Sequence, residues 1–359
     1  MNFEAFVNRV MDEIKEHLSE AYQDAEFVVK QHEKLNNQYA GLTIEGRSVA
    51  PVINLEDYFW DYEHGRSFES CIGAIAESIE MEQPEIDLGM LTDFDKAKEQ
   101  LFIRVSSAEK NADYLAKVPH TIVEDMAITY HLKMNVDESG VASSAVTNDT
   151  LRMYGVSVEE LHQAALENSE KVFPLYTFDM NERMRESFIA DMKKDGMPDE
   201  MIEMFLEDFP QPGENGMTVV TNDVGVNGAA AIFYPGVMEK LAEMTEGGFF
   251  ILPSSLHEMI ILPDRGDFSP EQLSEMVKEV NETQVEPWDR LTDEVYHYDP
   301  IDKVFEKATT FEERIAKKAE TERNAKKQSI MDKLDEKKEA AKAMVGEKKT
   351  PLRTAEASL

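Results

Sequence analysis

Residues 217–263 limit the fold most, because short apolar runs alternate there with turn residues and a dense polar cluster. The runs are four or five residues long, a length that favours strands over long helices. The expected strands cover residues 217–221, 229–233, 249–252 and 259–262. Between them, Val237, Leu241 and Met244 have the spacing of one helix face. Short strands mixed with helices predict an α+β fold.

The N-terminal unit, residues 1–118, is predicted to be one of two packed mixed units with short antiparallel strands and flanking helices. It begins with a helix, because the apolar residues from Phe3 to Ile14 recur at helical spacing. Further elements are expected as strands over 26–30, 39–44 and 100–105, and as helices over 55–64 and 68–79. The break at 117–120, which contains Pro119, ends this unit.

The C-terminal unit, residues 119–302, opens with two expected strands, 127–134 and 141–146, that we predict to form a hairpin. Ser157 precedes a helix and has a Glu three residues on, the spacing of a capping box. Ser269 carries similar start signals, with Pro and Glu directly after it. Both positions therefore predict helix N-termini.

Two further patterns lie inside this C-terminal unit. Residues 181–209 are rich in Met and acidic residues and favour a helical section. The tetrapeptide Val-Thr-Asn-Asp occurs at 146–149 and again at 220–223, each time after a β-rich run. Because Asn and Asp side chains bond to nearby backbone amides, the repeat favours shared turn chemistry over duplication.

The tail, residues 303–359, differs in composition from the rest. It contains 15 Lys and Arg against 11 Asp and Glu, and no large apolar residue occurs over 316–329. A helix without an apolar stripe has nothing to pack along its length. We expect a charged, solvated helical tail with a disordered end over 348–359.

The charge of the remaining chain restricts its partners. Residues 1–302 contain 61 Asp and Glu against 22 Lys and Arg. Such a surface repels phosphate backbones and anionic membranes, so we expect no direct nucleic-acid binding by this part of the chain and no membrane association. With no apolar run long enough to span a bilayer, we expect a cytoplasmic protein. A solubility-driven surface is the simplest interpretation, and an acidic decoy of a DNA-binding protein is the alternative.

Cofactor and metal motifs are incomplete throughout the sequence. Cys71 is the only cysteine, which excludes an intrachain disulfide and favours a core position. Gly225 and Gly228 follow a strand, yet neither phosphate-loop pattern is present. His257 and Glu258 begin a zinc motif, but Ile261 stands where a second imidazole is required. We expect no cofactor and no metal.

Nucleophilic catalysis is the most specific enzyme hypothesis. Ser254, Ser255, His257 and Glu258 lie within five residues between two expected strands, and Asn222 follows a third. Two hydroxyls, an imidazole and a carboxylate are the groups of a serine hydrolase. The usual sequence settings of such a serine are absent, and neighbouring residues rarely face each other productively. These five residues are therefore either a candidate hydrolase or small-ligand site, or a hydrogen-bonded structural corner.

Several long segments resemble a known family. They are residues 40–65, 154–169, 219–243, 250–264 and 280–299, of which GAAAIFYPGV and LPSSLHE are the most specific strings. The chain is similar over about residues 1–302 to an uncharacterised Firmicutes family, a domain of unknown function. That family occurs in gut anaerobes, often near conjugative elements, and is distantly similar to YtpQ-like cytosolic proteins. The resemblance implies an architecture and a cellular setting, and it implies no catalytic residue.

The function expected from these observations is that of a non-enzymatic interaction or accessory protein, with a link to mobile elements. Every catalytic motif considered is incomplete, so the residues favour a binding protein over an enzyme. We expect a protein partner whose identity the residues do not indicate. The alternatives are a hydrolase or ligand-binding protein that uses residues 254–258, and the acidic decoy.

Overall fold

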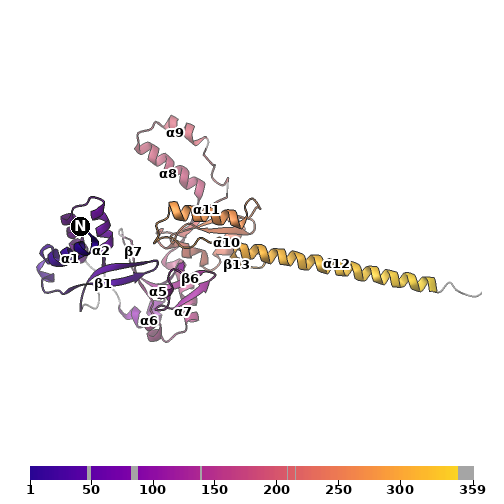
Figure 1. The fold of residues 1–359 in the computed structure, drawn as a ribbon, viewed down its shortest axis with the longest axis horizontal. Coiled ribbons are helices and arrows are strands. Elements are labelled where there is room, and N and C mark those ends of the chain that lie inside the picture. Colours follow the sequence, from indigo (N-terminus) through magenta and orange to yellow (C-terminus); the bar gives the residue numbers. More distant parts are fainter. Residues whose placement is uncertain (47–49, 82–87, 138–139, 208, 215, 347–359) are drawn as a thin grey trace, which may run out of the picture. The chain divides into compact units, whose positions relative to one another are not determined.

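The computed structural model describes residues 1–46, 50–81, 88–137, 140–207, 209–214 and 216–346. Residues 1–305 form one compact unit, and the residues from 306 onward form another (Figure 1). Several small antiparallel sheets combine with helices, which confirms the α+β prediction. Within residues 1–305 the buried side chains gather in two main cores, one from residues 6–79 and a larger one from residues 97–298.

The first core is enclosed by the N-terminal elements. These are α1 (Phe3–Glu13), η1 (Ile14–His17), η2 (Glu20–Tyr22), β1 (Phe27–Lys34), β2 (Asn37–Ile44), β3 (Ile53–Asn54), α2 (Leu55–Glu63) and α3 (Phe68–Glu80). The predicted helix at the N-terminus and the two helices that follow are confirmed. Asn2 caps α1, and Phe6 and Val10 on its inner face are fully buried. Gly65, at a φ of 100°, follows α2, as expected of a helix stop.

The second core begins with a four-stranded antiparallel sheet. The elements of this region are η3 (Leu88–Leu91), α4 (Phe94–Ala97), β4 (Leu101–Ser107), α5 (Ala112–Leu115), β5 (His120–Val123), β6 (Met126–Asp137), β7 (Gly140–Ala145), α6 (Asn148–Tyr154) and α7 (Val158–Val172). Strand β6 pairs with β4, β5 and β7. The predicted hairpin of β6 and β7 is confirmed, with Lys133 opposite Ser143. Ser157 and Glu160 form the predicted capping box of α7.

A six-stranded sheet supplies the rest of the second core. Its region contains β8 (Leu175–Asp179), α8 (Met180–Lys194), α9 (Asp199–Leu206), β9 (Thr218–Asn222), η4 (Gly228–Phe233), α10 (Val237–Met244), β10 (Phe249–Pro253), β11 (Met259–Pro263), α11 (Pro270–Thr283), β12 (Tyr296–Asp299) and β13 (Val304–Lys307). The strand order is β13-β12-β10-β11-β9-β8. A capping box of Ser269 and Gln272 opens α11, which confirms the predicted start.

The expected strand over residues 229–233 is wrong, because these residues form the 3₁₀ helix η4. Asn227, in the left-handed conformation at a φ of 53°, turns the chain so that the small residues of η4 pack against β9. The amide of Tyr234 then bonds to the carbonyl of Ala231, three residues back. The apolar residues of this segment predicted correctly that it is buried. The turn at Asn227 determines that the segment is a 3₁₀ helix and not a strand.

The helical section expected over residues 181–209 is confirmed as two helices, α8 and α9, with Gly196 and Pro198 in the break between them. The two copies of Val-Thr-Asn-Asp differ in structure. Thr147 caps α6 through its hydroxyl, whereas Thr221 lies inside β9 and donates to a distant carbonyl. Their surroundings, and not the tetrapeptide, therefore determine their hydrogen bonds.

The second unit consists of the long helix α12 (Ala308–Gly346), which confirms the helical tail. Its described side chains beyond Ile315 are exposed, as the absence of an apolar stripe predicts. Arg314 forms an ion pair with Glu306 at 2.7 Å near its start. The predicted disordered end, 348–359, lies outside the described residues.

Candidate functional site

The structure brings the five predicted site residues together at one corner. Ser254, Ser255, His257 and Glu258 form the connection between β10 and β11, and Asn222 ends the neighbouring strand β9. We call this group the His257 corner. Its backbone is fixed locally, since the amides of Ser254 and Ser255 both donate to the carbonyl of Glu258.

Both serine hydroxyls are used within the His257 corner. Ser254 Oγ donates to Glu258 Oε1 at 3.1 Å, and Ser255 Oγ accepts from the amide of His257 at 3.0 Å. Asn222 donates from Nδ2 to the carbonyl of Val226 at 2.9 Å. These are the short-range bonds by which Ser and Asn stabilise tight turns.

The His257 ring joins two more distant segments. Its Nδ1 accepts from the amide of Asn227 at 3.1 Å, so the ring proton of the neutral form lies on Nε2. Nε2 lies 3.2 Å from Asp289 Oδ1, to which it donates. The amide of Leu256 also bonds to the carbonyl of Asp289, at 2.7 Å. Two segments that are far apart in sequence therefore hold the connection in place.

The geometry pairs the imidazole with a carboxylate and not with a hydroxyl. A serine nucleophile needs its hydroxyl within hydrogen-bond reach of a general base. In the part of the chain that the structure describes, neither Ser254 nor Ser255 bonds to the His257 ring. What the arrangement does directly is hold β9, η4 and the β10–β11 connection together.

Sequence reasoning missed Asp289, because it lies 32 residues beyond His257 in a segment without a recognisable motif. It also missed the close packing at Gly228. A Cβ atom at that position would lie 2.6 Å from the carbonyl oxygen of His257 and 2.7 Å from the amide of Asn222. Only a glycine fits there, which marks the corner as tightly packed.

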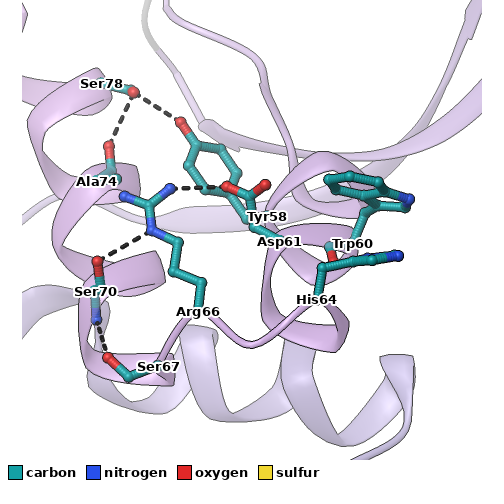
Figure 2. Close-up of polar contacts among 9 residues, drawn as sticks. All are labelled: Tyr58, Trp60, Asp61, His64, Arg66, Ser67, Ser70, Ala74 and Ser78. Atoms are coloured by element: carbon teal, nitrogen blue, oxygen red, sulfur yellow. Dashed lines mark hydrogen bonds and ion pairs between the residues drawn. The ribbon is translucent and has the colours of Figure 1, made fainter. Parts of the chain in front are cut away.

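A second polar cluster locks α2 to α3 (Figure 2). Arg66 donates to Asp61 Oδ2 at 2.8 Å and to Ser70 Oγ at 3.0 Å, so it joins the end of one helix to the start of the next. Trp60 stacks on His64 with 3.9 Å between ring centroids, and 57% of Trp60 is exposed. These bonds connect the two helices through the turn that contains Arg66.

A third candidate is the helical hairpin of α8 and α9, which lie side by side (Figure 1). The Phe188 ring of α8 meets the Phe205 ring edge-on and the Phe209 ring at a tilt. Arg185 of α8 donates a hydrogen bond to the carbonyl of Leu206. Four large apolar side chains remain exposed. They are Met184 (47%), Met201 (47%), Met204 (70%) and Phe205 (53%), and we call them the α8–α9 surface.

Across the described ranges, no group of three or more His, Cys, Asp or Glu residues is placed to hold a metal ion. No described helix combines the length and apolarity needed to cross a bilayer. Cys71 is fully buried in α3, and burial raises the pKa of its thiol, which makes it unreactive.

Comparison with known proteins identifies the family. No curated protein and no solved structure matches the chain significantly. A family model, described as a family of unknown function (DUF5688), matches residues 3–300. This match covers both cores, the His257 corner and the α8–α9 hairpin. The chain therefore belongs to the DUF5688 family.

Proposed function

We propose that this chain is a non-enzymatic interaction protein whose α8–α9 surface binds a basic amphipathic segment of a partner protein. The observation that carries the proposal is the exposure of three large apolar residues, Met201, Met204 and Phe205, on one short helix. Ile202 is the only buried residue of α9. A helix held to its own protein by so little buried surface has most of its apolar area available to a partner.

The residue types favour recognition of an adaptable kind. Methionine is flexible and polarisable, and proteins use it on surfaces that accept partners of varied shape. Phe205 adds a rigid aromatic anchor next to Met204. An amphipathic helix that inserts its apolar face between such side chains is a common mode of peptide recognition.

The charges around these side chains specify the sign of the partner. Asp199, Glu200 and Glu203 lie in α9, and this helix contains no Lys or Arg. Residues 180–209 together carry nine Asp and Glu against four Lys and Arg. A basic segment is therefore attracted and an acidic one repelled. An exposed anionic rim raises the association rate more than it raises the affinity.

One narrower form of this proposal combines the acidic charge with the cellular setting that the family resemblance implies, and one alternative to it is an enzyme. The partner could be a DNA-binding protein encoded near a mobile element, for which the acidic surface of residues 1–302 acts as a decoy. In that form binding weakens steeply with salt, and duplex DNA competes for the partner. A hydrolase centred on Ser254 or Ser255 is less favoured, because their hydroxyls are bonded within the His257 corner.

The proposal is tested with a fluorescein-labelled helical peptide of Leu and Lys and the full chain, by fluorescence anisotropy. We expect saturable binding that weakens about tenfold in Met204→Ser and in Phe205→Ser, the effect of losing one central apolar anchor. Met244→Ser is the matched control, because Met244 in α10 is 53% exposed and lies outside the α8–α9 surface. A peptide of Ser and Lys with the same charge measures the electrostatic contribution to binding alone.

Stability measurements separate a binding defect from misfolding. The two α9 side chains are largely exposed, so each substitution should change the free energy of unfolding by less than about 0.5 kcal/mol. Equal binding of both peptides, or equal weakening in Met244→Ser, would contradict the proposal. So would concentration-dependent dimerisation that Met204→Ser abolishes, because a second copy would then occupy the surface.

A further inference from the structure

One face of the sheet that contains β4, β6 and β7 carries several polar side chains beside Phe102, and its opposite face packs into the second core. Leu101, Ile103 and Val105 of β4 are buried in that core. The alternate residues, Phe102, Arg104 and Ser106, therefore lie on the other face. Register places His131 opposite Phe102 and Thr129 opposite Arg104, and Lys133 opposite Ser143 on the next strand.

The Arg104 side chain crosses this face. Its Nη2 donates to Ser143 Oγ at 2.7 Å, so the guanidinium extends over β6 to the strand beyond it. Lys133 is the direct neighbour of Ser143 in the register, and its Nζ lies 5.6 Å from the ring centroid of Phe173. Ser143 is thus bonded to Arg104 and is the register neighbour of Lys133. We call Arg104, Ser106, Lys133 and Ser143 the Arg104 face.

Neither cation of the Arg104 face forms an ion pair with any residue that the structure describes. The Nε atom of Arg104 is shielded from solvent and lacks a hydrogen-bond partner, and so does the hydroxyl of the fully buried Ser106. Burial lowers the pKa of Arg104 to about 10, which leaves it charged at neutral pH. A shielded guanidinium without an anion is costly to maintain.

The strand residues around Arg104 and Lys133 contain no carboxylate before Asp137, the last residue of β6. Residues 100–108, 126–136 and 140–148 contain no Asp or Glu, although 72 of the 359 residues of the chain are acidic. Elsewhere arginines are paired, as Arg9 is with Glu13 and Arg66 with Asp61. The separation of these two cations from acidic residues is therefore a local property of the three strands.

We propose that the Arg104 face binds the oxyanion group of a small ligand, a carboxylate or a phosphate. The planar guanidinium of Arg104 suits either group, because its donors match two oxygens at once. Lys133 adds a second positive charge, and the hydroxyls of Ser106 and Ser143 add donors. Arg104 as a whole is partly exposed, so the site lies near the surface of the sheet. This site is independent of the α8–α9 surface.

The test follows the side-chain Nε–H resonance of Arg104 by NMR in the full chain, assigned from its loss in Arg104→Lys. Sodium phosphate and sodium acetate are titrated separately, at ionic strength held constant with sodium chloride. We expect a saturable shift of this resonance with at least one of the two anions, and the anion that acts identifies the oxyanion class. In Lys133→Gln the same shift should need roughly tenfold more anion.

The matched control is Lys240→Gln, in α10, where the dissociation constant should equal that of the parent. A resonance that moves with neither anion, or moves linearly and equally in all variants, would overturn the proposal. Arg104→Met gives a second readout that does not depend on assignment. Its melting temperature should show no specific response to the anion that stabilises the parent, and a response equal to that of the parent would also overturn the proposal.

Discussion

Substitution of Gly228 by alanine is the sharpest test of the packing at the His257 corner. The added Cβ would lie 2.1 Å from Thr221 Oγ1, 2.6 Å from the carbonyl oxygen of His257 and 2.7 Å from the amide nitrogen of Asn222. The Thr221 hydroxyl can rotate, whereas the other two neighbours are backbone atoms of fixed elements. The methyl group therefore forces η4 away from β9.

The expected loss is worked from two effects. Overpacking of a close-packed site costs about 1–3 kcal/mol. Displacement of Thr221 also breaks its 2.8 Å bond to the carbonyl of His257, and an unpaired buried carbonyl costs a further 1–3 kcal/mol or so. We expect Gly228→Ala to lower the free energy of unfolding by about 2–6 kcal/mol. That is a large part of the roughly 5–15 kcal/mol typical of folded domains.

Urea denaturation followed by tryptophan fluorescence measures this loss. The chain has two tryptophans, and a Trp60→Phe background leaves Trp288, which adjoins Asp289 and so reports on the His257 corner. With a slope of about 3 kcal/mol per molar urea, the midpoint should fall by about 0.7 M or more.

Gly73→Ala is the matched control. Gly73 lies in α3, and a Cβ there meets nothing within 4 Å. Since alanine favours a helix over glycine, this variant should be unchanged or more stable by up to about 1 kcal/mol. A Gly228→Ala midpoint within about 0.3 M of the parent would refute the reasoning, because the corner would then have room for a methyl group.

Three further outcomes are expected. Deletion of residues 310–359 should leave the melting temperature unchanged, and a drop of several degrees in calorimetry would show that α12 contributes to the packing of residues 1–305. His257→Ala should cost about 1–3 kcal/mol in urea denaturation through the bonds to Asn227 and Asp289, and an unchanged midpoint would contradict the structural role of the ring. The hydrogen bond from His297 lowers the pKa of Asp264. The stability contributed by Asp264 is therefore present above its unfolded pKa of about 3.9 and is lost as pH falls through the lower folded value, so Asp264→Asn should flatten the acid limb of a stability–pH curve.

Much of the local structure could be predicted because its causes are local. The capping box at Ser157 depends on two residues three positions apart, and both are visible in the sequence. The same holds for the apolar stripe of α1, whereas the break at Gly196 and Pro198 inside the helical section was not predicted. In η4 the conformation depends on how the segment packs against its neighbours. There the apolar pattern predicted burial correctly, but the predicted strand is wrong.

The His257 corner shows where sequence reasoning stops. The composition of residues 254–258 fits a hydrolase as well as the turn that we favoured, because hydroxyls, an imidazole and a carboxylate within a short span can serve either. The two are distinguished by partners outside the span. Asp289 accepts a hydrogen bond from Nε2 of the ring, and the amide of Asn227 donates one to Nδ1, and neither residue is adjacent to His257 in sequence. A histidine whose two nitrogens are both bonded has no nitrogen left for a serine in the neutral form.

The sequence also contains a signal for the Arg104 face, the scarcity of acidic residues in its strands. Only the strand register shows that its two cations lie on the same face. Three strands with a single acidic residue, Asp137 at the end of β6, can be read directly from the sequence of a chain this acidic. The face of the sheet on which their cations lie cannot be read from the sequence, because a shift of one residue in strand pairing moves every side chain of a strand to the opposite face. Once Thr129 stands opposite Arg104 and Lys133 opposite Ser143, both cations lie on the face away from the core. In a chain with about twice as many acids as bases, such a pair without carboxylates is best explained by an anion that the sequence itself does not supply.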